Sequence, residues 1–342
     1  MLLDKMFSHR EQCAYRASKG LHFICGACGA ILLAAVLAGS AFGQTSLTTL
    51  YNFSGVDGDG SHPIGDLIMD ANGVLYGVTH GSPGDKIYQL IPPAFAGGER
   101  TKVNIYNGNA PGTEVHGNFT PLIFGKHGEL FGLSLACDNG PPHQGSCVFQ
   151  LSPPASAGGA WQMSILAYEL NFEYGDGRIV RTGTLAIDSN GNLYGITHRR
   201  ENETYGTVYQ LSPSGGGAWT QTLLYKFLRF PPPFIGFWEP QDGLVIDQNG
   251  ALYGSTTRGR VVYRLSPPTA AGGAWSATSL GGGFYDISGL TISPSGWLYA
   301  VDNIPFRGHK LIGIRIVPGV GPNYVESPFN FAGVWSRVGV GE

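Results

Sequence analysis

The sequence predicts an all-β protein, a single β-propeller of four-stranded blades, and three observations support this fold class. The composition combines 53 glycines and 12% aromatic residues with only 13% charged residues, which suits a protein with many tight turns. No stretch after residue 43 shows helical periodicity with capping residues. One phrase recurs through the chain as Leu67–Thr79, Leu122–Ser134, Leu185–Thr197 and Leu244–Thr256, with a weaker copy at Leu290–Val301.

The recurring phrase predicts a β-hairpin, the first two strands of each blade. Its halves are short runs of β-forming residues, and in three copies Asp-x-Asn-Gly stands between them. The Asn-Gly pairs supply the positive φ angles that a tight hairpin turn requires. We expect the aspartates to accept hydrogen bonds within their own turns. These aspartates are Asp70, Asp188 and Asp247.

An aromatic residue followed by glycine marks the second half of the phrase. The pairs stand at 76–77, 131–132, 194–195 and 253–254. Because they recur with the blade, we expect a structural role, in which the glycine lets neighbouring sheets approach and the ring fills the space between them.

Two further strands follow each hairpin. A second phrase, typified by Val208–Pro213, also occurs at 87–92, 148–153 and 262–267, with a degenerate copy at 313–318. Gly-Gly, in most copies followed by Ala-Trp, then leads into an aromatic run such as Leu223–Phe227. Each unit therefore contains four strands joined as a meander, as in a propeller blade. A solenoid of flat hairpins is the main structural alternative.

The number of blades follows from matching the strands. The blade phrases lie near 66–90, 121–151, 184–211, 243–265 and 289–317, and Thr45–Phe53 already resembles a fourth strand. We therefore expect five blades, with the ring closed by this N-terminal strand, which removes exposed sheet edges. Tyr324–Phe331 has a similar ending and is the alternative closing strand, and six blades are the alternative count.

Residues 1–43 are predicted to be a signal peptide. A basic start precedes the apolar run Phe23–Leu37, and small residues lead to a cleavage site before Gln44. An uncleaved anchor over Leu21–Phe42 is the alternative. Either way, residues 44–342 are expected to be secreted or held at the cell envelope. Export permits a disulfide between Cys137 and Cys147, pinning one loop, and two free buried thiols are the alternative.

The phrases G-x-L-x-x-D-x-x-G-x-L-Y-G-x-T and G-T-V-Y-x-L-S-P resemble the GloVer tandem repeat of exported bacterial proteins. The resemblance covers roughly Leu50–Pro318, and the order of strands is similar to that of NHL-type propellers. It implies an exported, β-propeller-like protein of no established activity.

Charge and motifs exclude several function classes. A formal net charge of −3 gives no electrostatic footprint for nucleic acid or an anionic membrane. No nucleophile elbow, zinc-protease motif or phosphate-binding glycine loop is present. We therefore expect a monomeric binding or interaction module for a polysaccharide or protein ligand, with no membrane contact beyond the leader and no cofactor.

The binding site is expected on the loops that break the repeat, which lie on one face around the central channel. The candidate ligand-binding residues there are His62, His116, Arg181, Trp238 and Tyr285. His62 and His116, with Asp66 or Glu114, are also weighed as metal ligands. Asp57 and Asp59 have the oxygen-rich character of a calcium loop but lack the later glutamate of an EF-hand.

Two other functions remain open. A carbohydrate-active hydrolase or lyase would use a pair of loop carboxylates. The candidates are Glu239, Asp242, Asp286 and Glu114. The second alternative is a purely structural protein of the cell envelope.

Overall fold

The computed structural model describes residues 48–331 apart from 57, 82–83, 96, 109, 139–143, 157, 169–182, 198–205, 228–239, 258–259, 271, 305–307 and 317–322. The chain divides into two units, Met1–Leu50 and Tyr51–Glu342. The predicted signal peptide lies outside the described residues. All the regular structure described belongs to the second unit and consists of β-strands.

The strands form five antiparallel sheets, and consecutive strands pair within each. The first blade contains β1 (Pro63–Met69), β2 (Leu75–Thr79), β3 (Lys86–Ile91) and β4 (Thr101–Asn107). The second contains β5 (Val115–Phe119), β6 (Ile123–Phe124), β7 (Leu130–Asp138), β8 (Gln144–Ser152) and β9 (Gln162–Tyr168). Its innermost strand is divided, because β5 and β6 both pair with β7.

The other three blades follow the same plan. The third contains β10 (Ala186–Ile187), β11 (Leu193–Thr197), β12 (Thr207–Gly215) and β13 (Ala218–Lys226). The fourth contains β14 (Pro240–Ile246), β15 (Leu252–Thr256), β16 (Val261–Ser266) and β17 (Ser276–Gly282). The fifth contains β18 (Ile287–Ile292), β19 (Trp297–Ile304), β20 (Gly308–Arg315) and β21 (Asn323–Phe331).

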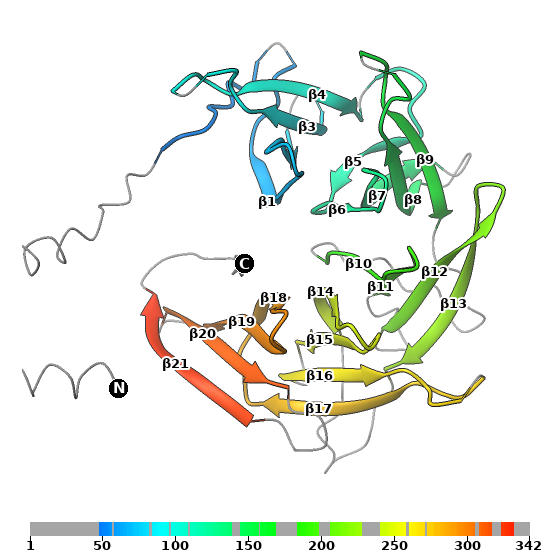
Figure 1. Cartoon of the computed structure of the whole chain (residues 1–342), viewed down its shortest axis with the longest axis vertical. Helices are drawn as coiled ribbons and strands as arrows, with labels where there is room; N and C mark the ends of the chain where they lie inside the picture. Colours follow the sequence, from blue (N-terminus) through cyan, green and yellow to red (C-terminus); the bar gives the residue numbers. More distant parts are fainter. Residues whose placement is uncertain are drawn as a thin grey trace, which may run out of the picture. The chain divides into compact units, whose positions relative to one another are not determined.

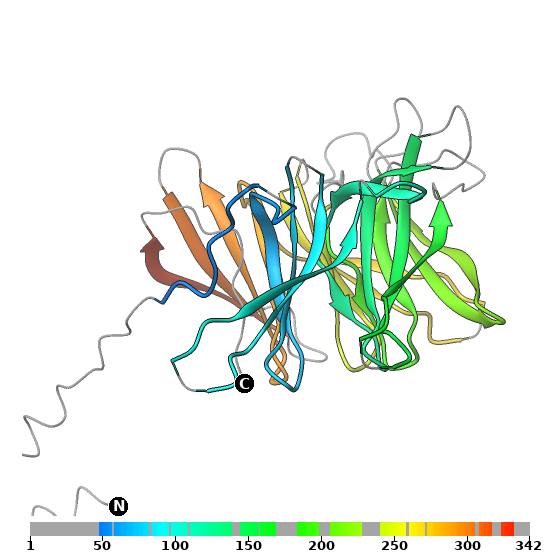
Figure 2. The ribbon, with the colours of Figure 1, turned by 90° about the horizontal axis from the view of Figure 1, so that it is seen from above.

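The five sheets are the blades of a β-propeller, so the predicted fold class and blade number are confirmed. Figure 1 shows β1, β6, β10, β14 and β18 around the centre, with the later strands of each blade farther out. One pocket is lined by residues from the innermost strands of all five blades, as a ring requires. Viewed at right angles, the strands run between two faces that carry the loops (Figure 2).

The predicted closure of the ring by an N-terminal strand is corrected by the structure. The fourth strand of the fifth blade is β21, which pairs with β20 from His309↔Phe331 to Arg315↔Asn323. A short local connection supplies β21, whereas the N-terminal segment must arrive from the far end of the chain. The described N-terminal residues form no strand. Phe53 instead packs against Tyr88 of β3, with ring centroids 5.1 Å apart.

The first hairpin of a blade is stabilised by the predicted aspartate turn. One Asp188 carboxylate oxygen accepts hydrogen bonds from the amides of Asn190 and Asn192, at 2.8 and 2.9 Å. The other accepts from the Tyr194 hydroxyl at 3.0 Å. Asp70 and Asp247 make the equivalent bonds, so the turn role of all three aspartates is confirmed.

The recurring glycine makes room for a ring on the adjoining strand of its own sheet. Gly195 of β11 pairs with Tyr209 of β12. A Cβ atom at Gly195 would lie 2.2 Å from the Tyr209 hydroxyl oxygen. Gly77, Gly132 and Gly254 face Tyr88, Phe149 and Tyr263 in the same way. The glycine therefore permits the close approach of a ring within its own sheet, which corrects the expectation that it lets neighbouring sheets approach.

We predict that Tyr209→Phe leaves the free energy of unfolding unchanged or raises it by up to about 1 kcal/mol. The Tyr209 side chain is fully buried, and its hydroxyl has no hydrogen-bond partner among the described residues. The second blade already has Phe149 at this position. Urea unfolding measures the effect, with Tyr194→Phe as the matched control.

The control should lose about 1 kcal/mol, because the Tyr194 hydroxyl bonds Asp188 and Gln210. If Tyr209→Phe lowered the free energy of unfolding as much as the control does, the Tyr209 hydroxyl would have to make a stabilising hydrogen bond, which would contradict the prediction.

Buried clusters join consecutive blades. Tyr76 of the first blade packs with Phe119 and Phe149 of the second, and Phe131 of the second packs with Leu185 of the third. Further clusters join the third blade to the fourth and the fourth to the fifth. The tryptophan of a fourth strand contributes as well, since Trp219 of β13 meets Phe131 edge-on at 5.9 Å.

Candidate functional site

The loops between blades, together with the starts of β5 and β14, place two groups of polar side chains on the face predicted to carry the site. One group belongs to the first and second blades and contains His62, His116 and Glu114. The other belongs to the fourth and fifth blades and contains Asp242, Tyr285 and Asp286. Arg181, Trp238, Glu239 and Asp57, which the sequence also nominated, lie outside the described residues.

In the first group, His116 pairs with an aspartate that the sequence analysis did not nominate. The His116 Nε2 atom lies 2.8 Å from Asp138 Oδ2. Asp138 follows Cys137, which forms the predicted disulfide with Cys147. The Asp138 amide donates to the Glu114 carbonyl oxygen at 2.8 Å, and the Glu114 carboxylate accepts from the Tyr168 hydroxyl at 3.4 Å. The disulfide therefore holds the strand end that carries this pair.

His62 is engaged separately from His116. Its Nδ1 atom lies 3.0 Å from the Ser61 hydroxyl, and its backbone carbonyl accepts from the His80 amide at 3.1 Å. Within the part of the chain that the structure describes, no three or more His, Cys, Asp or Glu residues are placed to hold a metal ion. The structure therefore does not join His62, His116, Asp66 and Glu114 into a metal site.

Asp59, weighed as a calcium ligand, is engaged in a network with the N-terminal segment. Its carboxylate accepts hydrogen bonds from Tyr51 at 2.7 Å and from the Ser54 amide at 2.6 Å. It also forms an ion pair with Lys102 of β4 at 3.2 Å. These contacts satisfy the carboxylate within the chain and give it a structural role.

In the second group, the Tyr285 ring is the prominent feature. It is 49% exposed, and the Arg260 guanidinium carbon lies 4.2 Å from its centroid. Arg260 Nε donates to the Phe284 carbonyl oxygen at 2.5 Å, which fixes the guanidinium beside the ring. The Tyr285 backbone is fixed too, because its amide donates to Asp302 Oδ1 at 2.7 Å. The result is a half-exposed aromatic ring whose backbone and neighbouring cation are both held by hydrogen bonds.

The candidate carboxylates of this group accept hydrogen bonds from neighbouring groups of the chain. Asp286 Oδ1 accepts from the Gln241 side-chain amide at 3.0 Å. Asp242 Oδ2 accepts from the Gly289 amide at 2.5 Å, a bond between the fourth and fifth blades. These bonds bring Asp242, Tyr285 and Asp286 into one region between the fourth and fifth blades.

Two residues that organise this region, Asp302 and Arg260, were not predicted from the sequence. Asp302 is 6% exposed and accepts from the amides of both Tyr285 and Asp286. It ends the run Leu298–Asp302, where the fifth blade departs from the aromatic-glycine pattern of the others. This departure from the repeat is the sequence feature that could have marked Asp302. Arg260 lies just before β16, and no repeated feature marks it.

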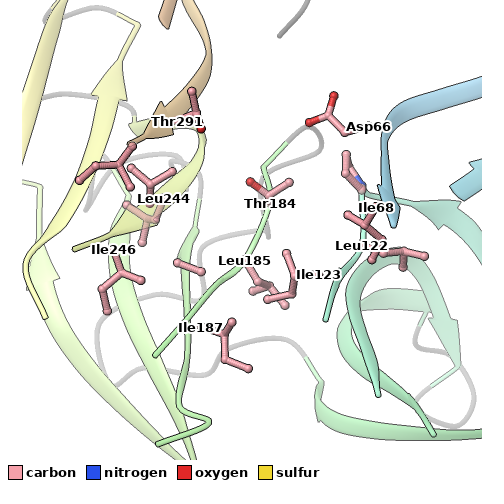
Figure 3. A pocket seen from close by; sticks show the side chains of 14 residues that line it. Asp66, Ile68, Leu122, Ile123, Thr184, Leu185, Ile187, Leu244, Ile246 and Thr291 are labelled. Carbon is pink, nitrogen blue, oxygen red and sulfur yellow. The ribbon is translucent and has the colours of Figure 1, made fainter. Parts of the chain in front are cut away.

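A pocket of about 310 Å³ lies between the innermost strands. Its walls are mainly isoleucine and leucine, and its polar side chains are Asp66, Thr184 and Thr291. In Figure 3, Asp66 and Thr184 lie toward one end and Ile187 lies toward the other. The pocket therefore has an apolar body with one negatively charged position.

No protein-family model and no curated protein matches the sequence. Solved structures do match over most of the chain. The aldose sugar dehydrogenase of Streptomyces coelicolor, in its PQQ-bound form, is 14% identical, with 81% of this chain and 83% of that chain covered and a TM-score of 0.49. A luciferin-regenerating enzyme is 16% identical, with 80% of each chain covered and a TM-score of 0.46.

A catalytically inactive H270A virginiamycin B lyase from Staphylococcus aureus, in a structure with quinupristin, is 14% identical. The match covers 78% of this chain and 71% of the lyase chain, with a TM-score of 0.43. Likeness at this level carries no information on substrate or activity. The described part of the chain also holds no helix that could cross a membrane.

Proposed function

We propose that this protein is an exported binding module that holds a polysaccharide on the loop face of its fourth and fifth blades. One observation carries the proposal: the half-exposed Tyr285 ring, backed by Arg260 and flanked by Gln241 and Asp286. A sugar presents an apolar C–H face to an aromatic ring and hydroxyl groups to carboxylates and amides. The ring is already fixed, so little side-chain entropy is lost on binding.

Binding accounts for the carboxylates better than catalysis does. Hydrolysis by two carboxylates needs one to act as acid and the other as base or nucleophile. Asp242 bonds a backbone amide of the next blade, and Asp286 bonds the Gln241 side chain. These bonds suit groups that position loops and accept hydrogen bonds from a ligand.

Export, membership among GloVer-repeat proteins and a monomeric state are part of the same proposal. Export is supported by the leader pattern of residues 1–43 and by the disulfide, and membership by the repeated phrases. A disulfide forms and persists in oxidising compartments outside the cytosol.

The test is a depletion assay with purified residues 44–342. The protein is mixed with insoluble polysaccharides and cell-wall fractions, with and without calcium, and both bound protein and released reducing ends are measured. We expect at least one polysaccharide to remove the protein from solution without releasing reducing ends. Release of reducing ends would replace the proposal with the hydrolase alternative and make Asp242 and Asp286 the next targets. No depletion would favour a protein ligand or a structural envelope role.

We predict that Tyr285→Ala weakens binding to the retaining polysaccharide about tenfold or more, as loss of a central aromatic contact does. The matched control is Phe95→Ala, which removes a 72%-exposed ring from the β3–β4 connection. In a meander, that connection lies on the opposite face from the candidate site. Equal losses in the two variants would show that retention does not use the loop face.

A further inference from the structure

We infer that the C-terminal segment, residues 332–342, packs against the side of the first blade that faces the fifth blade. These two blades are neighbours in the ring (Figure 1). Buried clusters join each of the other four pairs of neighbouring blades. Among the described residues, no such cluster joins the fifth blade to the first. The inference concerns this junction alone and does not depend on the proposed polysaccharide site.

The leucine that begins the recurring phrase shows how this junction differs. Leu122, Leu185 and Leu244 are 2%, 3% and 2% exposed, because each belongs to the cluster shared with the preceding blade. Leu67 of the first blade is 46% exposed. Met69, on the same side of β1, is 62% exposed, whereas its counterparts in the other four blades are half-buried. The first blade therefore presents an uncovered apolar face.

A second kind of contact between blades is also missing at this junction. Near the start of a fourth strand, Trp161 of the second blade meets Tyr76 of the first at 6.1 Å, and Trp219 of the third meets Phe131 of the second at 5.9 Å. The first blade has Arg100 in place of this tryptophan. Arg100 donates to two carbonyl oxygens of its own blade, at 2.9 and 3.1 Å. The first blade therefore extends no tryptophan ring toward the fifth.

The N-terminal segment covers only the outer part of the uncovered face. Phe53 packs against Tyr88 of β3, and Tyr88 is 2% exposed. On the innermost strand, Leu67 and Met69 keep their exposure with that segment in place. An occupant of the inner part must therefore come from another segment of the chain or from another molecule.

The C-terminal segment suits this face by its starting point, length and composition. It directly follows β21, the outer strand of the fifth blade. The innermost strand lies three strand spacings away, about 14 Å, and facing sheets lie about 10 Å apart. Eleven extended residues reach up to roughly 36 Å, which spans both distances. Val334, Trp335, Val338 and Val340 supply apolar side chains, and Trp335 provides the ring that Arg100 does not.

The contact should be weaker than a junction between two blades. The segment is attached to the ring at one end and has few large apolar side chains to bury. We therefore expect it to open locally, without unfolding of the ring. The rate at which a reagent reaches the covered face measures such opening.

The experiment places a reactive thiol on this face of purified residues 44–342. Cys137 and Cys147 form the disulfide, so Met69→Cys introduces the single free thiol. Its alkylation by iodoacetamide is followed by mass spectrometry. The reference is Phe95→Cys, because Phe95 is 72% exposed on the β3–β4 connection. We expect the thiol at position 69 to react at least about fivefold more slowly than the thiol at position 95.

A substitution in the segment identifies what covers the face. Trp335→Ala should remove most of the protection at position 69 and leave the rate at position 95 unchanged. Trp335→Phe keeps an aromatic ring, so it is the matched control and should keep most of the protection. Leu67→Cys repeats the measurement at a second position of the same face.

Three outcomes would overturn the inference. Equal rates at positions 69 and 95 with Trp335 present would show that the face is open in solution. Protection that survives Trp335→Ala would assign the cover to another segment or, where it grows with protein concentration, to a second copy of the chain. Equal acceleration at both positions by Trp335→Ala would show a general loosening of the blade.

Discussion

Leu185→Ala is expected to lower the free energy of unfolding by about 2–5 kcal/mol, and Leu67→Ala by about 1 kcal/mol or less. The two leucines begin copies of the same phrase, so they hold matching positions in the repeat. Leu185 is 3% exposed and packs in the cluster that joins the second and third blades. Leu67 is 46% exposed. The difference comes from the cavity that alanine leaves in a close-packed junction.

Urea unfolding of the purified protein measures both losses, and the slope with denaturant shows whether unfolding stays two-state. Leu244→Ala is the replicate, because Leu244 is 2% exposed and occupies the same position in the fourth blade. It should behave as Leu185→Ala does. A loss at Leu67→Ala equal to the other two would show that the first blade is covered as tightly as the others in solution.

The same repeat explains how much of the fold could be predicted. The aspartate turn is local, because Asp188 bonds groups two, four and six residues ahead. Turn chemistry of this kind is visible in the sequence, and each copy of the phrase repeats it. Strand pairing within a blade follows from the short connections, so blade number and strand order were predictable.

The closing strand was not predictable in the same way. Leu50–Gly55 and Pro328–Gly333 carry similar endings, and either suits a fourth strand by local pattern. The choice depends on which segment reaches the edge of β20, and the structure gives that edge to β21. The local sequence pattern does not show which of the two distant segments pairs with β20.

The candidate site was predictable as a region but not as a network. Asp242, Tyr285 and Asp286 were nominated because they interrupt the repeat on one face. Asp302 and Arg260 organise them across positions 16 to 24 residues apart, through contacts such as Arg260 with the Phe284 carbonyl. Such pairings are set by the register of strands, which linear spacing does not show.

Lys102→Met is expected to weaken the attachment of segment Tyr51–Ser61 to the first blade by about 1–3 kcal/mol. The Lys102 side chain is 4% exposed and pairs with Asp59, which is 15% exposed. Its ammonium group also donates to the Asp59 carbonyl oxygen at 2.5 Å and lies 5.7–6.0 Å from the ring centroids of Tyr51, Phe53 and Tyr88. Removing the cation leaves a largely buried carboxylate without its counter-charge.

The same network gives the attachment a pH dependence of known sign. Burial by itself raises the pKa of Asp59, but hydrogen bonds from Ser54, Tyr51 and Lys102 outweigh it and hold that pKa well below its ordinary value. The stabilisation is therefore present above pH 4 or so and is lost as the pH falls further. The Asp59 hydrogen bond raises the pKa of Tyr51 to about 12. The Tyr51 contribution is thus complete below about pH 10 and is lost as the pH rises toward 12.

Hydrogen exchange of peptides from residues 51–61, followed by mass spectrometry, measures both effects after correction for the intrinsic pH dependence of exchange. Lys102→Met should exchange faster than the wild type at neutral pH. The double variant Asp59→Asn with Lys102→Met should recover part of the protection, because it removes the buried charge that the single variant leaves unpaired. If the double variant loses at least as much protection as the single one, the lysine acts through its contact with the three rings and not through Asp59. Unchanged protection in Lys102→Met would show that the segment is held by its aromatic packing alone.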